Sequence, residues 1–240
     1  MKFVCTKCGR TEPVTTRNAH CSCGGLWKLD FTPEKFELSG IDTHEWSQFR
    51  YRRYMALDGE SWRGVTLGEG MTPVVTFDED VSFKMDYFMP TLSFKDRGAA
   101  VLIAHCKAIG VDRVVQDSSG NAGNAVAAYC AKAGIGCEIF VPEGTSPKKI
   151  DMIRAHGAIC TVVPGSRDHC ADVCREKVEK EGVYYANTSI TRFSMRAQKH
   201  ISMRSSSSSE ESRRTLSSPS ETARCFSARS SRWSICKKAA

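Results

Sequence analysis

The strongest constraint on the fold is a regular alternation of short apolar runs with longer helical stretches between residues 94 and 185. The short runs are rich in β-branched and aromatic residues, which is typical of strands. The predicted strands are 113–116, 137–141, 159–163 and 183–185, and the predicted helices are 94–109, 123–133, 146–156 and 168–181. Because strands joined by helices of this length require right-handed crossovers, the sequence predicts an α/β fold with a parallel sheet and flanking helices.

Two close cysteine pairs precede this core. The pairs are Cys5 with Cys8, and Cys21 with Cys23. Each pair is followed by glycine, which permits a tight turn, and four thiolates suit tetrahedral zinc. We interpret residues 1–30 as a small zinc ribbon, a structural staple for a segment too small to fold alone. His20 is a competing ligand, and a disulfide or unliganded thiols are the alternatives.

The region between the ribbon and the regular pattern is harder to interpret. Residues 31–63 follow a helical pattern in places, and Thr32-Pro33 is a plausible helix start. A glycine-flexed turn at 67–71 leads into a short strand at 74–75, and 83–85 is predicted to be another strand.

Lys95 lies at a strand-to-helix junction, directly before an apolar run. Burial disfavours the ammonium form and lowers the pKa of a lysine, and a neutral amine attacks carbonyl carbon to form a Schiff base. Taken alone, the segment fits an ordinary exposed lysine at a helix start better than a Schiff-base lysine.

A polar loop at 117–125 follows the strand 113–116, at the carboxyl end of the predicted sheet. Parallel sheets bind ligands at this end. Its hydroxyls, its side-chain amides and the free N–H groups of a helix N-terminus suit a carboxylate or a phosphate. A capping loop without a catalytic role is the alternative. The loop is neither a Walker loop nor a dinucleotide-binding fingerprint.

Taken together, four stretches resemble the tryptophan synthase β-like class of pyridoxal-phosphate (PLP) enzymes, also called fold type II. They are residues 67–73 (LGEGMTP), 93–98 (SFKDRG), 118–125 (SSGNAGNA) and 141–144 (VPEG). Within that class the LGEG stretch and the cysteine pairs ahead of it most resemble threonine synthase, a lyase that converts O-phosphohomoserine and water to threonine and phosphate. The likeness covers roughly residues 1–200.

The resemblance implies roles for individual residues. Lys95 would hold pyridoxal 5'-phosphate as a Schiff base and later serve as the proton-transferring base. Phe94 would pack beside this lysine and keep it desolvated, and Asn121 would hydrogen-bond the ring hydroxyl of the cofactor. The substrate carboxylate would be held by Ser118, Ser119, Asn121 and Ala122.

A phosphorylated substrate needs a second anion site, and this one stays unassigned. The candidates are Arg97, Lys148, Lys149 and Arg192, each of which also fits a surface or helix charge. Residues 89–92 (MPTL) depart from the NPTG that the family usually has before the serine. We expect the loss of that glycine to alter the turn that approaches Lys95.

The regular pattern stops after residue 200. Residues 201–240 contain 14 serines, and they show neither a strand nor an amphipathic helix pattern. A disordered basic tail and translation in a shifted reading frame are the two interpretations. The family's glycine-rich phosphate cradle and its partner for the pyridine nitrogen are not found. We therefore expect the chain as written, with 31–200 as the N-terminal part of an enzyme core, to bind cofactor poorly and to be catalytically weak.

Charge and hydropathy exclude some classes of protein. The net charge of +7 comes mostly from residues 201–240, which hold eight Lys/Arg and three Asp/Glu, so a nucleic-acid partner is not favoured. No run of 18 apolar residues exists, which predicts no membrane span. The N-terminus lacks an apolar signal core, so the 12 cysteines are predicted to be reduced in a cytoplasmic protein.

The leading hypothesis is a threonine synthase-like lyase with a small-molecule amino-acid substrate, and a homodimer is compatible with a full-length form. Cysteate synthase, threonine/serine dehydratase and cysteine synthase are alternatives within the same class. A zinc-ribbon protein whose basic tail binds nucleic acid is the alternative from another class.

Overall fold

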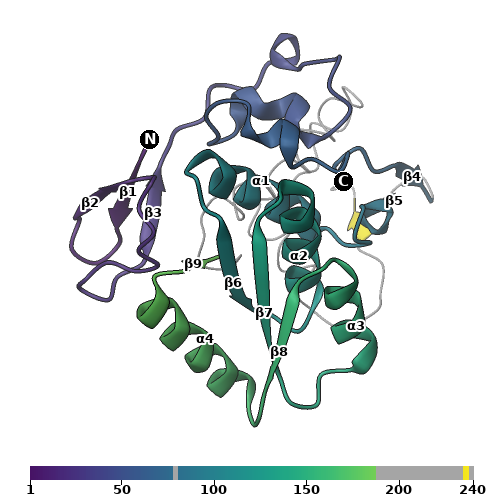
Figure 1. Cartoon of the computed structure of the whole chain (residues 1–240). Coiled ribbons are helices and arrows are strands. Elements are labelled where there is room, and N and C mark those ends of the chain that lie inside the picture. The colour runs from purple at the N-terminus through teal and green to yellow at the C-terminus, as the bar shows by residue number, and fades with distance from the viewer. Residues whose placement is uncertain (78–80, 188–234, 238–240) are drawn as a thin grey trace.

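The predicted parallel sheet is present in the computed structural model, which describes residues 1–77, 81–187 and 235–237 (Figure 1). Its four strands lie in the order β8-β7-β6-β9, and every neighbouring pair is parallel. The strands are β6 (Arg113–Asp117), β7 (Gly136–Pro142), β8 (Ile159–Val163) and β9 (Tyr184–Tyr185). The strand order reverses after β8, because β9 pairs with the opposite edge of β6.

The four predicted helices are also present, with ends within a few residues of the expected ones. They are α1 (Lys95–Ala108), α2 (Asn121–Ala133), α3 (Pro147–Ala155) and α4 (Arg167–Glu181). Helix α2 packs on α1, β7 and α3, whereas α4 packs on β6, β7 and β8. The α/β architecture with flanking helices is therefore confirmed.

Two apolar cores lie on the two faces of the sheet. Val114 of β6 belongs to the larger core, together with residues of α1 and α2. The next residue, Val115, belongs to a smaller core with Phe140 and the α4 residue Cys174. Because successive strand residues point to opposite faces, apolar side chains are needed on both faces, as at 114–115 of β6 and 139–141 of β7.

The N-terminal segment forms a small antiparallel sheet in the order β2-β1-β3. Its strands are β1 (Lys2–Cys5), β2 (Thr11–Pro13) and β3 (Trp27–Asp30). Phe3, Trp27 and Leu29 are buried in the same core as α1. This sheet is thus packed onto the α/β core through apolar side chains.

The expected helix start at Thr32-Pro33 was wrong. Residues 31–37 form no helix, and only short 3-10 turns follow before α1. These turns are η1 (Leu38–Gly40), η2 (Gln48–Tyr54), η3 (Ser61–Gly64) and η4 (Asp86–Phe88). The reason is a competing contact: the Tyr54 hydroxyl donates to the carbonyl of Glu37 at 2.7 Å and accepts from its N–H at 3.1 Å. These backbone groups are therefore not available for a helical ladder.

A second antiparallel sheet has the order β10-β5-β4. Strands β4 (Val74–Thr76) and β5 (Val81–Lys84) agree with the expected strands to within a few residues. Strand β10 (Ile235–Lys237) corrects the expectation that residues 201–240 hold no strand. It pairs with the edge of β5, where free backbone groups can accept another strand. The predictions for 201–234 and 238–240 fall outside the described residues.

Across the described segments, no helix is both long enough and apolar enough to span a bilayer.

The turn before α1 has a left-handed backbone at a position that is not occupied by glycine. Leu92 has a φ of 60°, and it is the only non-glycine residue with positive φ among the described residues. Its N–H donates to the carbonyl of Met89 at 2.8 Å, and its side chain is 70% exposed. The MPTL departure therefore places a side chain at a position with a left-handed backbone, where residues other than glycine are strained.

We expect Leu92→Gly to stabilise the protein by about 1 kcal/mol relative to Leu92→Ala, because glycine removes a left-handed penalty of about 1–2 kcal/mol and loses part of it to backbone entropy. Both variants remove the same exposed side chain, so they differ mainly in the Cβ atom. Urea denaturation measures the difference in the free energy of unfolding. Equal stability of the two variants would show that the turn is not strained.

Candidate functional site

Helices α1 and α2 begin at the same end of the sheet. Near their C-terminal ends, Lys107 Nζ of α1 donates to the carbonyl of Ala133 in α2 at 3.2 Å. Each of these residues lies 12 positions after the first residue of its helix, Lys95 or Asn121. Because α1 and α2 pack on each other, their N-termini both lie toward the carboxyl end of β6. This is the end at which parallel sheets bind ligands.

Lys95 is half-buried at the first position of α1. Burial lowers the pKa of its amine, and Nζ lies 4.7 Å from the centre of the Phe94 ring. Within the described segments, no carboxylate forms an ion pair with it. A desolvated lysine without an acidic partner is suited to condense with an aldehyde.

The next residue, Asp96, is fully buried and caps the turn that precedes α1. Its carboxylate accepts hydrogen bonds from the Thr91 hydroxyl and, at 2.7 Å, from the Thr91 N–H. Burial raises the pKa of Asp96 to about 6 despite these hydrogen bonds. The contact locks Pro90–Ser93 against the helix that carries Lys95.

Arg97 is not a surface charge, nor is it available to a substrate phosphate. It is 1% exposed, and its guanidinium donates to both carboxylate oxygens of Asp86, at 2.9 and 3.2 Å. Burial alone would raise the pKa of Asp86, but the charges of Arg97 and Lys84 hold it below its usual value. The remaining candidates for a second anion site gain no support, since Lys148 and Lys149 are exposed at the start of α3 and Arg192 lies outside the described residues.

Glu69 is a structural residue whose importance the sequence did not reveal. It is 1% exposed and accepts hydrogen bonds from the Leu67 N–H at 2.9 Å and the Tyr129 hydroxyl at 3.1 Å. Gln48 Nε2 donates to Glu69 at 3.3 Å and to the carbonyl of Arg97 at 3.1 Å. Burial raises the pKa of Glu69. The only sequence signal was its place in the LGEG stretch, which carries the resemblance.

The loop between β6 and α2 offers hydrogen-bond donors. Ser118, Ser119 and Ala122 are half-buried and Asn121 is exposed. Gly120, at the N-cap, has no side chain to cap the helix, and the N–H groups at 121–123 have no acceptor in the part of the chain that is described. These donors, together with the serine hydroxyls, suit a carboxylate or a phosphate.

Gly123 allows this loop to approach α2 closely. A Cβ atom at this position would lie 2.1 Å from the carbonyl oxygen of Ser118. Any other residue would therefore push the loop away from the helix start. Steric contact with the Ser118 carbonyl therefore explains why the second glycine of the SSGNAGNA stretch is a glycine.

The structure thus places the predicted site residues in two groups at one end of the sheet, Phe94 and Lys95 at the start of α1 and residues 118–122 at the start of α2. The residues fit PLP in two respects, a desolvated amine for its aldehyde and donors for an anionic partner. The phosphate cradle and the pyridine-nitrogen partner stay unassigned.

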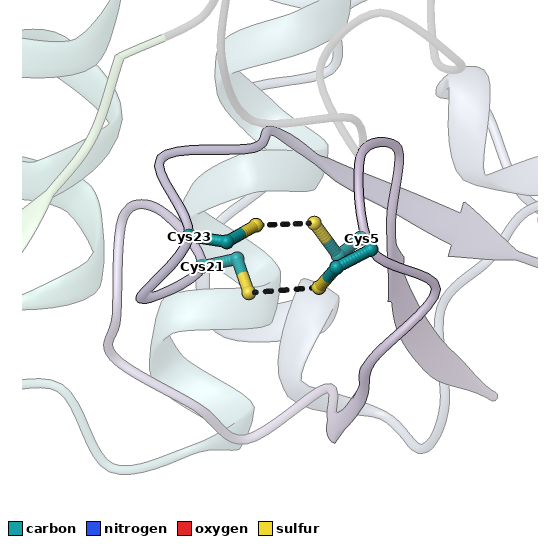
Figure 2. A group of neighbouring side chains, drawn as sticks. Cys5, Cys21 and Cys23 are labelled. Atoms are coloured by element: carbon teal, nitrogen blue, oxygen red, sulfur yellow. Dashed lines mark hydrogen bonds between the residues drawn. The ribbon is translucent and has the colours of Figure 1, made fainter.

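The four N-terminal cysteines lie together, apart from this site (Figure 2). Cys5 Sγ is 3.5 Å from Cys23 Sγ, and Cys8 Sγ is 3.7 Å from Cys21 Sγ. All four sulfur atoms lie within 4.8 Å of one another. These separations exclude a disulfide, whose sulfur atoms are about 2.05 Å apart. His20 is not a member of the cluster.

Gly25 is required beside the cysteine cluster. A Cβ atom at Gly25 would lie 2.5 Å from Cys5 Sγ. The glycine that follows the second cysteine pair therefore leaves room for the first pair.

Comparison with known proteins agrees with the geometry. Threonine synthase from Methanocaldococcus jannaschii is 31% identical over 210 residues, which cover 82% of this chain and 51% of that protein. Threonine synthase from Methanosarcina acetivorans is 31% identical over 213 residues, with the same coverage of 82% and 51%. The chain thus spans about half the length of these curated relatives.

Among solved structures, diaminopropionate ammonia lyase from Escherichia coli superimposes with a TM-score of 0.55 at 19% identity, covering 78% of this chain and 54% of that chain. At this identity the likeness supports the fold alone. Residues 65–207, more than half of the chain, match the family model described as pyridoxal-phosphate dependent enzyme. The chain therefore belongs to the family of pyridoxal-phosphate dependent enzymes.

Proposed function

We propose that this chain carries the lysine-bearing part of a PLP-dependent lyase that converts O-phosphohomoserine and water to threonine and phosphate. The observation that carries the proposal is a half-buried Lys95 that forms no ion pair with a described residue, at the same end of the sheet as the N-terminus of α2, which has no side-chain cap. The choice of reaction is supported by the similarity to curated threonine synthases.

Each residue of the site has a distinct task in this proposal. When bound, the cofactor supplies an electron sink for carbanion chemistry. Lys95 would hold its aldehyde carbon covalently, and the same amine would then move protons at the substrate carbons. Phe94 would shield the amine from water, and the Asn121 amide would donate to the ring hydroxyl.

The α2 N-terminus would orient the amino-acid substrate. Hydroxyl and N–H donors at Ser118, Ser119, Asn121 and Ala122 would bind its carboxylate, where the positive end of the helix favours negative charge. Because α1 and α2 begin at the same end of the sheet, a carboxylate bound here would lie on the side of the sheet that carries Lys95.

The matched test uses the PLP-loaded chain with three substrates. Because the chain as written is expected to bind cofactor poorly and to be catalytically weak, we expect slow formation of phosphate and threonine from O-phosphohomoserine, and no product from O-phosphoserine with sulfite or from threonine alone. Lys95→Ala should lower the rate of product formation at least about 10³-fold, because the covalent attachment point and the base are lost together. Lys132→Ala is the control, since Lys132 is an exposed lysine of α2 outside the site.

Two outcomes contradict the proposed reaction. If ammonia and a keto acid form from threonine, the chain is a dehydratase. If cysteate forms from O-phosphoserine and sulfite, it is a cysteate synthase.

The cysteine cluster is proposed to hold a structural zinc ion. A zinc–sulfur distance of about 2.3 Å requires sulfur atoms about 3.8 Å apart at the corners of a tetrahedron. The measured separations of 3.5 and 3.7 Å fit this geometry. The ion would join the two cysteine turns, and the strands beside them place Phe3 and Trp27 in the core with α1.

We expect the purified chain to contain a single zinc ion, and Cys8→Ser to lose most of it, because one of four thiolate ligands is removed. Cys8 is exposed, so the substitution does not disturb packing. Cys160→Ser, a thiol of β8 outside the cluster, should keep its zinc. Atomic absorption measures the metal content. Equal zinc content in the two variants would contradict the site.

A further inference from the structure

A buried polar cluster lies where the strand order reverses. Strands β6 and β9 are neighbours in the sheet. From β6 the chain continues through α2 to β7 on one side, whereas β9 follows α4 and pairs with β6 on the other side. Open α/β sheets bind ligands in the crevice at the carboxyl ends of such a strand pair. The residues that occupy these ends are Asp117 of β6 and Tyr185 of β9, with Asn187 two positions further along.

Three hydrogen bonds hold the cluster together. The Tyr185 hydroxyl donates to Asp117 Oδ1 at 2.5 Å, and Asn187 Nδ2 donates to the same oxygen at 3.1 Å. Asn187 Nδ2 also lies 3.0 Å from the Tyr185 hydroxyl oxygen. Asp117 is 9% exposed and Tyr185 6%. In the described part of the chain, no cation forms an ion pair with Asp117.

Sheet pairing alone does not require this arrangement. The ladder between β6 and β9 is complete at Val115 and Tyr185, and the Ala186 N–H adds a bond to the carbonyl of Val115 at 2.9 Å. An apolar residue at 117 would extend the small core beneath α4 without the cost of burying a carboxylate. The carboxylate therefore has a task that packing does not supply.

The neighbouring contacts indicate that task. Asp117 directly precedes Ser118, whose carbonyl oxygen is pressed against Gly123 at the start of α2. The backbone of Ser118 is thus fixed on one side by the helix and on the other by Asp117. We propose that Asp117, Tyr185 and Asn187 form a positioning clamp that fixes the loop 118–122 for the carboxylate of the substrate. This inference rests on the proposed role of that loop.

The electrostatics of the clamp are specific. A free carboxylate one residue from an anion-binding loop would repel an anionic substrate. Two neutral donors on Oδ1 hold the carboxylate beneath the loop without adding a cation that would compete for the substrate. We attribute the role of Asp117 to the position of its acceptor oxygen and not to its negative charge. A neutral side chain of the same shape, such as that of asparagine, should therefore hold the loop equally well.

Hydrogen–deuterium exchange of the full chain tests the clamp without any ligand. We expect Tyr185→Phe to increase amide exchange at residues 118–122 about tenfold, because the loop loses one of its anchors. Tyr184→Phe is the control, since it removes the same atom from the preceding residue, which belongs to the other core. Asn187→Ala, at a partly exposed position, is the second variant in case Tyr185→Phe fails to fold.

Substrate titration of the PLP-loaded chain supplies the functional readout. Tyr185→Phe should raise the KM for O-phosphohomoserine about tenfold, equivalent to about 1.4 kcal/mol, with unchanged cofactor loading at Lys95. Asp117→Asn alone should leave the KM near that of the parent, because the amide oxygen of asparagine accepts the same two hydrogen bonds.

The outcomes separate the clamp from the proposed function. Equal loop exchange in Tyr185→Phe, Asn187→Ala and Tyr184→Phe overturns the clamp. A KM that rises as much in Asp117→Asn as in Tyr185→Phe also overturns it, because the charge would then be the essential feature. If exchange rises as expected while the parent chain binds no amino acid, the clamp stands and the proposed function fails.

Discussion

The buried ion pair between Asp86 and Arg97 fixes the part of the structure on which the site depends. Removing both charges from water costs several kcal/mol for each ion, and the two-pronged contact at 2.9 and 3.2 Å offsets this cost through fork geometry. Arg97 also donates to the carbonyl of Gly70 at 3.3 Å. The pair thereby ties the first turn of α1 to the segments at 70–72 and 86.

The first turn of α1 carries three consecutive charged residues that have different surroundings. Asp96 is buried and hydrogen-bonded to Thr91, and Arg97 is buried and ion-paired with Asp86. Lys95, in contrast, is half-buried, has a lowered pKa and forms no ion pair with a described residue. The ion pair and the Thr91 contact to Asp96 hold the backbone on both sides of Lys95. A lysine held in this way loses less freedom when it attaches to a ligand, which is the advantage of a preorganised site.

The sequence predicted what depends on local pattern, and it failed where distant residues compete. The alternation of strands and helices located the parallel sheet, because each element carries its own periodicity and turn residues. The contacts of Glu69 with Tyr129 and of Asp117 with Tyr185 join residues 60 and 68 positions apart, and no local pattern encodes such pairs. The helix expected at Thr32-Pro33 failed for the same reason, since Tyr54 takes the backbone groups of Glu37.

Among the lysines of this chain, Lys95 is the one whose surroundings suit it to carry the cofactor. The most direct test of this role is chemical mapping: the chain is incubated with pyridoxal 5'-phosphate, reduced with borohydride and digested, and the modified lysine is identified by mass spectrometry. We expect the pyridoxyl group on Lys95 at low excess of cofactor, because its amine is partly desolvated and forms no ion pair with a described residue. Modification spread over exposed lysines such as Lys132 and Lys148, with Lys95 unmodified, would contradict it.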